Sequence, residues 1–177
     1  MEESYENYKI VFTGPVASGK TTAINSISGI PTVSTEEKAT DETQHVKHDT
    51  TVAMDYGILK MPSGGIVHLY GTPGQERFSY MREILVEGSL GLILLINNTS
   101  SEPFKDMDHY ISAFSDFIDK TSLVIGITHM DEKFQPSISQ YHKYLANKQK
   151  KYPIFEVDPR EDRDIKILLQ ALLYSLP

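Results

Sequence analysis

The sequence contains no cysteine, and this absence excludes several kinds of protein. Without cysteine there is no disulfide scaffold, no thiolate metal site and no prenylated or palmitoylated residue. The second residue is Glu2, whereas N-myristoylation requires glycine at that position. We therefore expect no covalent lipid anchor on this chain.

The sequence also lacks a long apolar run and an excess of positive charge. No stretch approaches the roughly 20 apolar residues that a membrane-spanning helix needs. The first residues have neither the basic region nor the apolar core of a secretory signal. The formal net charge is −7 at pH 7, and this charge would repel both nucleic acid and anionic membranes. These absences predict a cytoplasmic protein with no nucleic-acid partner.

What is present is typical of one globular domain. The chain has 177 residues, of which 40% are hydrophobic and 23% are charged. This length is enough to bury a core, and the composition is that of a folded protein. We predict a single domain over residues 1–177, with a flexible tail over residues 1–7.

Apolar runs and amphipathic patterns alternate along the chain. This order is typical of a three-layer α/β fold, in which helices cover both faces of a mostly parallel sheet. We expect about six strands, at residues 8–13, 51–60, 66–70, 90–96, 123–127 and 153–157. We expect five helices, at residues 21–27, 80–87, 102–120, 137–151 and 162–176. The turn at 61–65 predicts an antiparallel hairpin at the sheet edge, and the aperiodic stretch 29–49 is expected to be largely loop.

The most informative segment is the run Gly14-Pro15-Val16-Ala17-Ser18-Gly19-Lys20-Thr21, which fits the phosphate-binding pattern G-x-x-x-x-G-K-[ST]. It lies between a predicted strand and a predicted helix. Gly14 and Gly19 allow the backbone to curl so that its N–H groups face a phosphate, and the helix N-terminus adds its positive end. Lys20 is placed to reach the outer phosphates, and the Thr21 hydroxyl is placed to ligate Mg²⁺. The segment predicts a nucleoside triphosphate site.

With this loop and this order of elements, the chain resembles a Ras-like small GTPase, a P-loop G domain, over nearly its whole length. It looks closest to the bacterial small GTPases of the gliding and cell-polarity type. The Gly14-Pro15 opening and the run Lys20-Thr21-Thr22 suit that subgroup. The resemblance implies GTP and GDP as ligands, Mg²⁺ as cofactor, protein effectors, and a regulatory activator for which the subgroup suggests a roadblock fold.

Two further segments are similar to the switch motifs of this family. Thr51, before the second predicted strand, resembles the threonine that ligates Mg²⁺ and senses the γ-phosphate; Thr50 is the alternative, and the spacing to Asp55 favours Thr51. Residues 70–78, Tyr-Gly-Thr-Pro-Gly-Gln-Glu-Arg-Phe, resemble the family's D-T-A-G-Q-E-R-F. The resemblance implies that the Gly74 N–H meets the γ-phosphate and that Gln75 orients the attacking water. The alternatives are a β-forming pair at 50–51 and a solvated loop glutamine at 75.

The run Thr128-His129-Met130-Asp131 follows a predicted buried strand, where the family has its base-reading N-K-x-D motif. Asp131 would accept hydrogen bonds from N1–H and the 2-amino group of guanine, which adenine does not offer in that arrangement. Thr128 and His129 replace the Asn and Lys of the motif and can imitate them only in part. The alternative for Asp131 is a cap at the start of the next helix.

The last nucleotide motif of the family, S-A-K, aligns with Asp158-Pro159-Arg160. The family recognises guanine O6 through the backbone N–H of the middle residue, and proline has none. The backbone N–H of Arg160 is the candidate substitute. These replacements predict weaker nucleotide affinity and weaker guanine selectivity.

Two departures from the family pattern affect hydrolysis. Gly71 stands where the family has an aspartate that holds a Mg²⁺-bound water, and its loss predicts a metal site weakened by about 10–100-fold. Val16 stands at a glycine position of Ras proteins, where a side chain obstructs an arginine finger from a partner. We therefore expect slow hydrolysis. Arg77 or Arg82 could supply an arginine in cis, or could be partner-facing residues.

The function predicted from these motifs is a GTP-dependent molecular switch that hydrolyses a phosphoric anhydride slowly. One alternative is a pseudo-GTPase scaffold with negligible turnover, which Gly71 and Val16 favour and Gln75 opposes. Another is an ATP-binding, kinase-like P-loop protein, which the Asp131 motif disfavours. The spacing His45-x-x-His48 is compatible with a metal site. A structural Zn²⁺ site, however, requires four protein ligands, which this polar loop does not offer.

Overall fold

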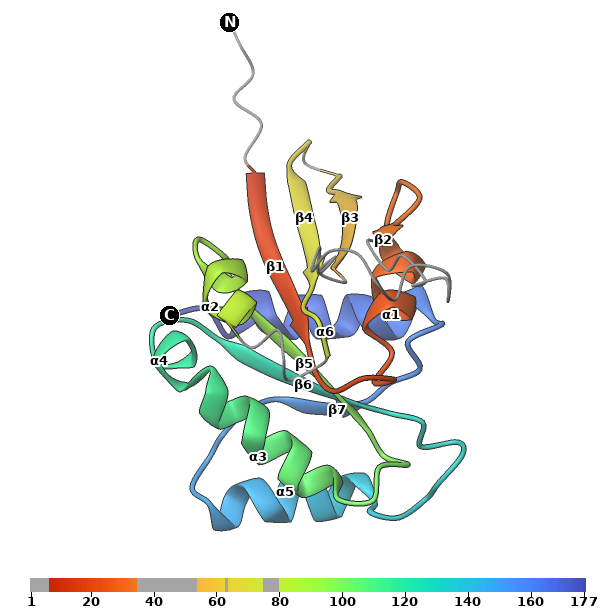
Figure 1. The fold of residues 1–177 in the computed structure, drawn as a ribbon, viewed down its shortest axis with the longest axis vertical. Helices are drawn as coiled ribbons and strands as arrows, with labels where there is room; N and C mark the ends of the chain where they lie inside the picture. The colour runs from red at the N-terminus through yellow and green to blue at the C-terminus, as the bar shows by residue number, and fades with distance from the viewer. Residues whose placement is uncertain (1–6, 35–53, 63, 75–79) are drawn as a thin grey trace, which may run out of the picture.

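The computed structural model describes residues 7–34, 54–62, 64–74 and 80–177 (Figure 1). In these ranges the strands are β1 (Asn7–Thr13), β2 (Val33–Ser34), β3 (Asp55–Lys60), β4 (Ile66–Gly71), β5 (Gly91–Asn97), β6 (Leu123–Thr128) and β7 (Ile154–Glu156). The helices are α1 (Lys20–Ile27), α2 (Tyr80–Val86), α3 (Pro103–Ala113), α4 (Ser115–Ile118), α5 (Ile138–Asn147) and α6 (Asp162–Tyr174). The predicted alternation of strands and helices is confirmed.

The strands form one sheet in the order β2-β3-β4-β1-β5-β6-β7. β1 pairs in parallel with β4 and β5, and β6 pairs in parallel with β5 and β7. β3 is antiparallel to β2 and β4. The mostly parallel sheet with an antiparallel edge hairpin is therefore confirmed. The seventh strand, β2, lies within the stretch expected to be loop; at two residues it is too short to show periodicity, and its pairing with β3 defines it.

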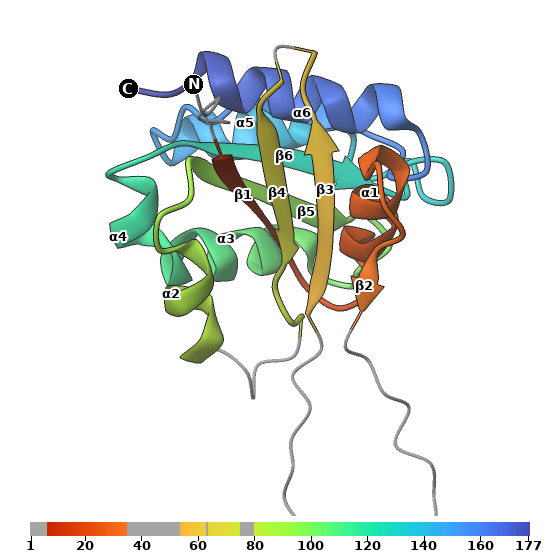
Figure 2. The same ribbon diagram turned by 90° about the horizontal axis from the view of Figure 1, so that it is seen from above.

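The sheet carries a hydrophobic core on each face, which makes the fold three-layered (Figure 2). β5 shows the reason, because every second side chain packs on the opposite face. Leu92, Leu94 and Ile96 belong to the cluster that α3 and α5 cover. Ile93 and Leu95 belong to the cluster that α1 and α6 cover. A strand buried on both faces is continuously apolar, as the sequence of β5 is.

The helix expected over residues 102–120 is divided at Phe114. α3 ends at Ala113, and α4 follows as a single turn from Ser115 to Ile118. Phe114 has φ −113° and ψ 15°, outside the helical region, while its side chain is only 3% exposed. Because Phe114 and Ile118 both face the core, the apolar spacing continues across the break. Periodicity alone could not detect it.

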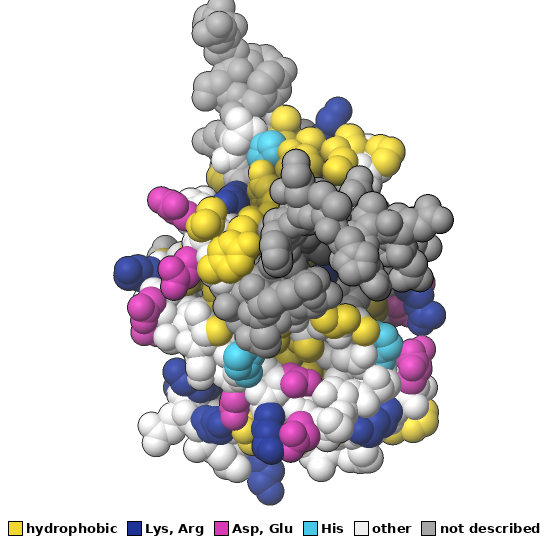
Figure 3. Space-filling model, viewed as in Figure 1, with side chains coloured by type: hydrophobic (Ala, Val, Ile, Leu, Met, Phe, Trp, Pro, Cys, Tyr) yellow, Lys and Arg dark blue, Asp and Glu magenta, His cyan; other side chains and the backbone are white. Residues whose placement is uncertain are grey.

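The surface combines apolar and charged areas. On the face drawn in Figure 3, hydrophobic side chains gather around the β3–β4 hairpin, whereas acidic and basic side chains are intermixed over α3 and α5. One such pair joins Lys148 of the α5 C-terminus to Asp108 of α3. Among the helices that the structure describes, none is both long enough and apolar enough to cross a bilayer.

Candidate nucleotide-binding site

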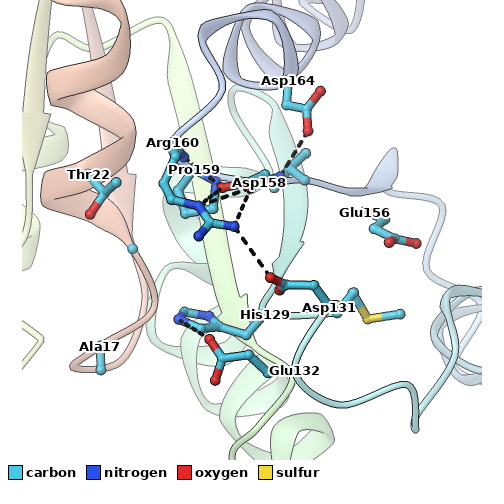
Figure 4. A pocket seen from close by; sticks show the side chains of 13 residues that line it. Ala17, Thr22, His129, Asp131, Glu132, Glu156, Asp158, Pro159, Arg160 and Asp164 are labelled. Carbon is cyan, nitrogen blue, oxygen red and sulfur yellow. Dashed lines mark hydrogen bonds and ion pairs between the residues drawn. The ribbon is translucent and has the colours of Figure 1, made fainter.

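The segments that follow β1, β6 and β7 converge at one edge of the sheet, where a pocket of about 620 Å³ opens (Figure 4). The carboxyl ends of parallel strands meet at such an edge, which is where α/β proteins bind ligands. Eight of the residues predicted for the site line the pocket: Ala17, Gly19, Thr22, His129, Asp131, Asp158, Pro159 and Arg160. Sequence segments separated by more than a hundred residues thus form one cavity.

The loop between β1 and α1 has a tightly curled backbone that requires glycine at position 14. Gly14 has φ +142°, and a Cβ atom there would lie 2.1 Å from the carbonyl oxygen of Leu95. A side chain at this position is sterically impossible without moving β5. Ala17 also has a positive φ, of 61°, and the loop is closed by a hydrogen bond from the Ser18 N–H to the Pro15 carbonyl. This tight curl is the conformation that the phosphate-binding motif predicts.

Lys20 begins α1 and is directed back into the loop. Its side chain is buried, at 7% exposure. The ammonium group donates hydrogen bonds to the carbonyl oxygens of Gly14, at 2.8 Å, and Pro15, at 2.7 Å. These bonds place a positive charge at the centre of the loop, where the predicted phosphates would bind.

Thr21 follows Lys20, and its hydroxyl donates a hydrogen bond of 2.6 Å to Oδ2 of Asp55. Asp55 lies on β3 and is only 7% exposed. In the antiparallel register Asp55 is opposite Gly71 of β4. A Cβ atom at Gly71 would lie 3.0 Å from Asp55 Oδ2, so the Asp55 carboxylate lies against the place where a side chain at 71 would begin. The carboxylate that β4 lacks is thus present on the neighbouring strand.

From the sequence, Asp55 served only to favour Thr51 over Thr50, and its contact with Thr21 was not predicted. Two unusual residues in the β3–β4 hairpin could have indicated the role of Asp55. An aspartate stands at a buried strand position, and its partner across the strand is a glycine in place of the family's aspartate. A buried carboxylate needs a donor or a cation, and Thr21 supplies the donor here.

The groups around Thr21 fit a magnesium ion. Mg²⁺ prefers hard oxygen ligands and is typically held by one or two carboxylates or hydroxyls together with substrate phosphates. The Thr21 hydroxyl and the Asp55 carboxylate are such a donor set. In the described ranges, no cluster of three or more His, Cys, Asp or Glu side chains could hold a metal by itself.

Several predicted residues lie outside the described residues. These are Thr50, Thr51, Gln75, Arg77, His45 and His48. Residues 1–6 of the expected tail also lie outside the described residues, and Asn7 begins β1. Arg82 lies in α2. The roles given to these residues stay predictions.

Gly74, the predicted γ-phosphate sensor, lies against the phosphate loop. A Cβ atom at Gly74 would lie 2.6 Å from the backbone nitrogen of Val16. The Tyr110 hydroxyl donates to the Gly74 carbonyl at 3.3 Å, which links the segment to α3. The Val16 side chain is 62% exposed. Gly74 thus packs against the backbone of the phosphate loop at Val16, and its role as a sensor stays a prediction.

Thr128 joins the base-reading segment to the phosphate loop. It is fully buried, and its hydroxyl donates to the Ser18 carbonyl at 3.1 Å, with the Ile96 carbonyl at 3.3 Å. Nδ1 of His129 lies 2.8 Å from the same hydroxyl oxygen. Thr128, which stands where the family has an asparagine, therefore links this segment to the phosphate loop.

Asp131 and Arg160 meet across the mouth of the pocket (Figure 4). Nη2 of Arg160 lies 3.3 Å from Oδ2 of Asp131 and 2.6 Å from Oδ2 of Asp158. Nε of Arg160 donates to Oδ1 of Asp158 at 2.8 Å. These hydrogen bonds lower the pKa of Asp158 and raise the pKa of Arg160. The pair therefore stays ionised at neutral pH.

The backbone of the 158–160 segment differs from the sequence expectation. The Arg160 N–H, predicted as the substitute donor for guanine O6, donates to Oδ1 of Asp158 at 2.9 Å. Pro159 packs against the phosphate loop, since a Cβ atom at Gly19 would lie 2.8 Å from Pro159 Cγ. The Asp158 N–H donates to Oδ2 of Asp164 at 2.9 Å. The segment is thus fixed by its own side chains and by the first turn of α6.

Comparisons with known proteins agree with the site. A model of the Ras family matches residues 9–176, from β1 to beyond the end of α6. The chain is also 30% identical over 125 residues to the uncharacterized protein MJ1339 of Methanocaldococcus jannaschii, an alignment that covers 67% of this chain and 73% of that protein. The matched range includes the phosphate loop, the β3–β4 hairpin and residues 128–131 and 158–160. This chain therefore belongs to the Ras family.

Proposed function

We propose that this protein is a molecular switch that binds GTP and hydrolyses it slowly to GDP. Ras-family membership supports guanine-nucleotide binding. The observation that carries the proposal is the single pocket between the phosphate loop and Asp131. A nucleotide in this pocket would place its phosphates on the loop and its base beside Asp131.

The phosphate end has the groups that charge stabilisation requires. Lys20 and the loop amides would stabilise negative charge on the phosphates, since preorganised donors act most strongly where water is excluded. Thr21, Asp55 and, by prediction, Thr51 would hold the cation. Bound Mg²⁺ would supply Lewis-acid stabilisation of the phosphate oxygens.

The switch itself would reside in two loops. In the GTP state, Thr51 and Gly74 would both be held by the γ-phosphate, and hydrolysis would release them. Gln75 would orient the attacking water. Slow turnover would follow from Val16, which is exposed and whose backbone lies against Gly74, because its side chain would obstruct an arginine from a partner. An activator would then use Arg77, Arg82 or its own arginine in another geometry.

The partners follow from the subgroup. We assign the chain to the bacterial gliding and cell-polarity GTPases on the Gly14-Pro15 opening and the run Lys20-Thr21-Thr22. That assignment implies effectors that recognise the switch loops and a regulatory activator of roadblock fold. It is an analogy at the level of the family.

Val16 also favours a second candidate, a pseudo-GTPase scaffold that holds GTP without turnover. Mass spectrometry of the nucleotide released from purified protein separates the candidates. GDP supports the switch, GTP supports the scaffold, and ADP or ATP would contradict guanine binding altogether.

A turnover measurement on Gln75→Leu tests the hydrolytic step. We expect the rate of GTP hydrolysis to fall while GTP affinity stays unchanged, because Gln75 would act on the water in the transition state. Gln170→Leu, at an exposed position of α6, is the control. An unchanged rate in Gln75→Leu, measured with any required activator, would show that another residue orients the water.

A further inference from the structure

The segment 158–160 has no main-chain donor left for the base. The Asp158 N–H donates to Asp164 Oδ2, and the Arg160 N–H donates to Asp158 Oδ1, each at 2.9 Å. Pro159, between them, has no N–H. A guanine O6 atom at this place would therefore be an acceptor without a main-chain partner, and a buried unpaired acceptor is costly.

The Arg160 side chain is the donor that lies nearest to the base-reading carboxylate. Its Nη2 atom lies 3.3 Å from Asp131 Oδ2. On guanine, O6 is bonded to the carbon next to N1, so the donor for O6 must lie beside the carboxylate that accepts from N1–H. Figure 4 shows the guanidinium of Arg160 directed into the pocket from the side opposite His129.

The guanidinium of Arg160 has more N–H donors than its bonds to Asp158 and Asp131 use. It carries five N–H groups, and the bonds to Asp158 and Asp131 use Nε and Nη2. Nη1 makes no hydrogen bond to the part of the chain that the structure describes. Asp131, in turn, has two carboxylate oxygens with about four acceptor positions, so its contact with Arg160 leaves room for N1–H and the 2-amino group.

We propose that the Arg160 guanidinium, held in place by Asp158, donates a hydrogen bond to O6 of the guanine whose N1–H and 2-amino groups Asp131 accepts. This inference rests on the proposed function, because it presupposes a guanine nucleotide in the pocket. Arginine makes the same contact to guanine O6 in nucleic-acid recognition. Adenine would present an amino donor to a cationic donor, so Arg160 would also disfavour ADP and ATP.

Asp158 is a positioning residue in this scheme. It binds Nε and Nη2 of Arg160 together, which fixes the plane of the guanidinium, and its own backbone is anchored to α6 through Asp164. Such a fork is specific to arginine, since lysine offers only a point charge. Arg160→Lys should therefore keep the charge and lose the directed contact.

The test compares GDP, 6-thio-GDP and ADP by titration in the presence of Mg²⁺. 6-Thio-GDP differs from GDP only at position 6, where sulfur is a weak acceptor. Wild-type protein should prefer GDP over 6-thio-GDP. In Arg160→Ala we expect GDP affinity to fall by roughly 5- to 100-fold, with little change for 6-thio-GDP, so that the preference disappears. Arg160→Lys should lose part of the preference, and Arg163→Ala, an exposed arginine of α6 outside the pocket, should keep it.

Each other outcome overturns the inference in a distinct way. An equal loss of GDP and 6-thio-GDP in Arg160→Ala would mean that Arg160 stacks on the base or neutralises charge. An unchanged preference would mean that O6 is read elsewhere. Absence of GDP binding to wild-type protein would overturn the proposed function itself. Circular dichroism and thermal unfolding confirm that the variants fold, and Arg160→Lys carries the test if Arg160→Ala does not.

Discussion

The phosphate end of the pocket is built from a buried lysine and main-chain groups, whereas the base end is built from exposed side chains that pair with one another. Lys20 is 7% exposed and is held by two carbonyl oxygens. The side chains of Asp131 and Arg160 are 64% and 67% exposed and bind each other. On the proposed function, the two ends would recognise their parts of a nucleotide by different physical means.

This difference explains why the pattern G-x-x-x-x-G-K-[ST] is complete in the phosphate loop, whereas residues 128–131 and 158–160 depart from the family motifs. A phosphate is bound by converging N–H groups, so the backbone conformation is the recognition element and a residue such as Gly14 cannot be replaced. A base edge is read by individual donors and acceptors, which different side chains can supply. Thr128 and Arg160 stand where the family pattern has other residues, and their side chains bind Ser18 and Asp131 of the protein itself.

The largest effect is expected from Lys20→Ala, which breaks the phosphate end. GTP affinity should fall by roughly 10³-fold, because a positioned and buried charge partner of the phosphates is lost. The fold should remain, since the ammonium contacts loop carbonyls and not the core. Titration with a fluorescent GTP analogue measures the loss, and circular dichroism checks the fold.

Lys143→Ala, at an exposed position of α5, is the matched control for charge and should bind normally. A folded Lys20→Ala protein with near-normal GTP affinity would contradict the phosphate site and the proposed function with it.

Asp131→Asn tests the base end. The variant should lose GTP and gain xanthosine triphosphate, because the new amide can donate to the 2-oxo group of xanthine while the aspartate cannot. Hydrogen-bonding sites penalise a mismatched partner by on the order of 10⁴-fold at best. At a carboxylate that is 64% exposed, we expect about 10²-fold, since water screens exposed groups.

Competition of GTP, ATP and xanthosine triphosphate against both proteins measures this change in preference. The structure rules out the helix-cap alternative for Asp131, since the N-cap of α5 is Ser137. If the order of preference stays the same, Asp131 does not read the base. In that case the contrast between the two ends would not concern nucleotide recognition.

Asp55→Asn should have a smaller effect than Asp131→Asn, and it tests whether the Asp55 carboxylate contributes to Mg²⁺ binding at the phosphate end. A carboxylate that supports a metal site typically contributes about 10–100-fold to metal affinity, so the Mg²⁺ concentration needed for tight GDP binding should rise by that factor. Asp106→Asn, an acidic residue of α3 bound to Ser100, is the control. Mg²⁺ titration of GDP release gives the measurement.

A double variant asks whether the carboxylate can return to β4. The double variant Asp55→Ala, Gly71→Asp lacks the Asp55 oxygen that would lie 3.0 Å from the new Cβ. It should bind GDP tightly at a lower Mg²⁺ concentration than Asp55→Asn does. Unaltered Mg²⁺ dependence in Asp55→Asn alone would show that the Thr21–Asp55 contact is structural and has no part in binding the metal.

The layers of the fold and the phosphate loop could be predicted from the sequence. β5 shows this most clearly, because residues 92–96 are all apolar and buried, which is the pattern of a strand covered on both faces. The loop was predictable for a related reason. Its conformation depends on positive φ angles at Gly14 and Gly19, which glycine adopts readily because it has no Cβ atom. Both are local signals.

The contacts between distant side chains, by contrast, depend on how the chain folds in three dimensions. The register of β3 on β4 places Asp55 against Gly71, and the fold of the 158–160 segment turns the Arg160 N–H toward Asp158 and its guanidinium toward Asp131. The two-residue strand β2 and the break at Phe114 likewise depend on contacts with other elements. Some of these contacts join residues that are distant in sequence, and in others two acceptors compete for one donor. No local sequence pattern encodes either kind.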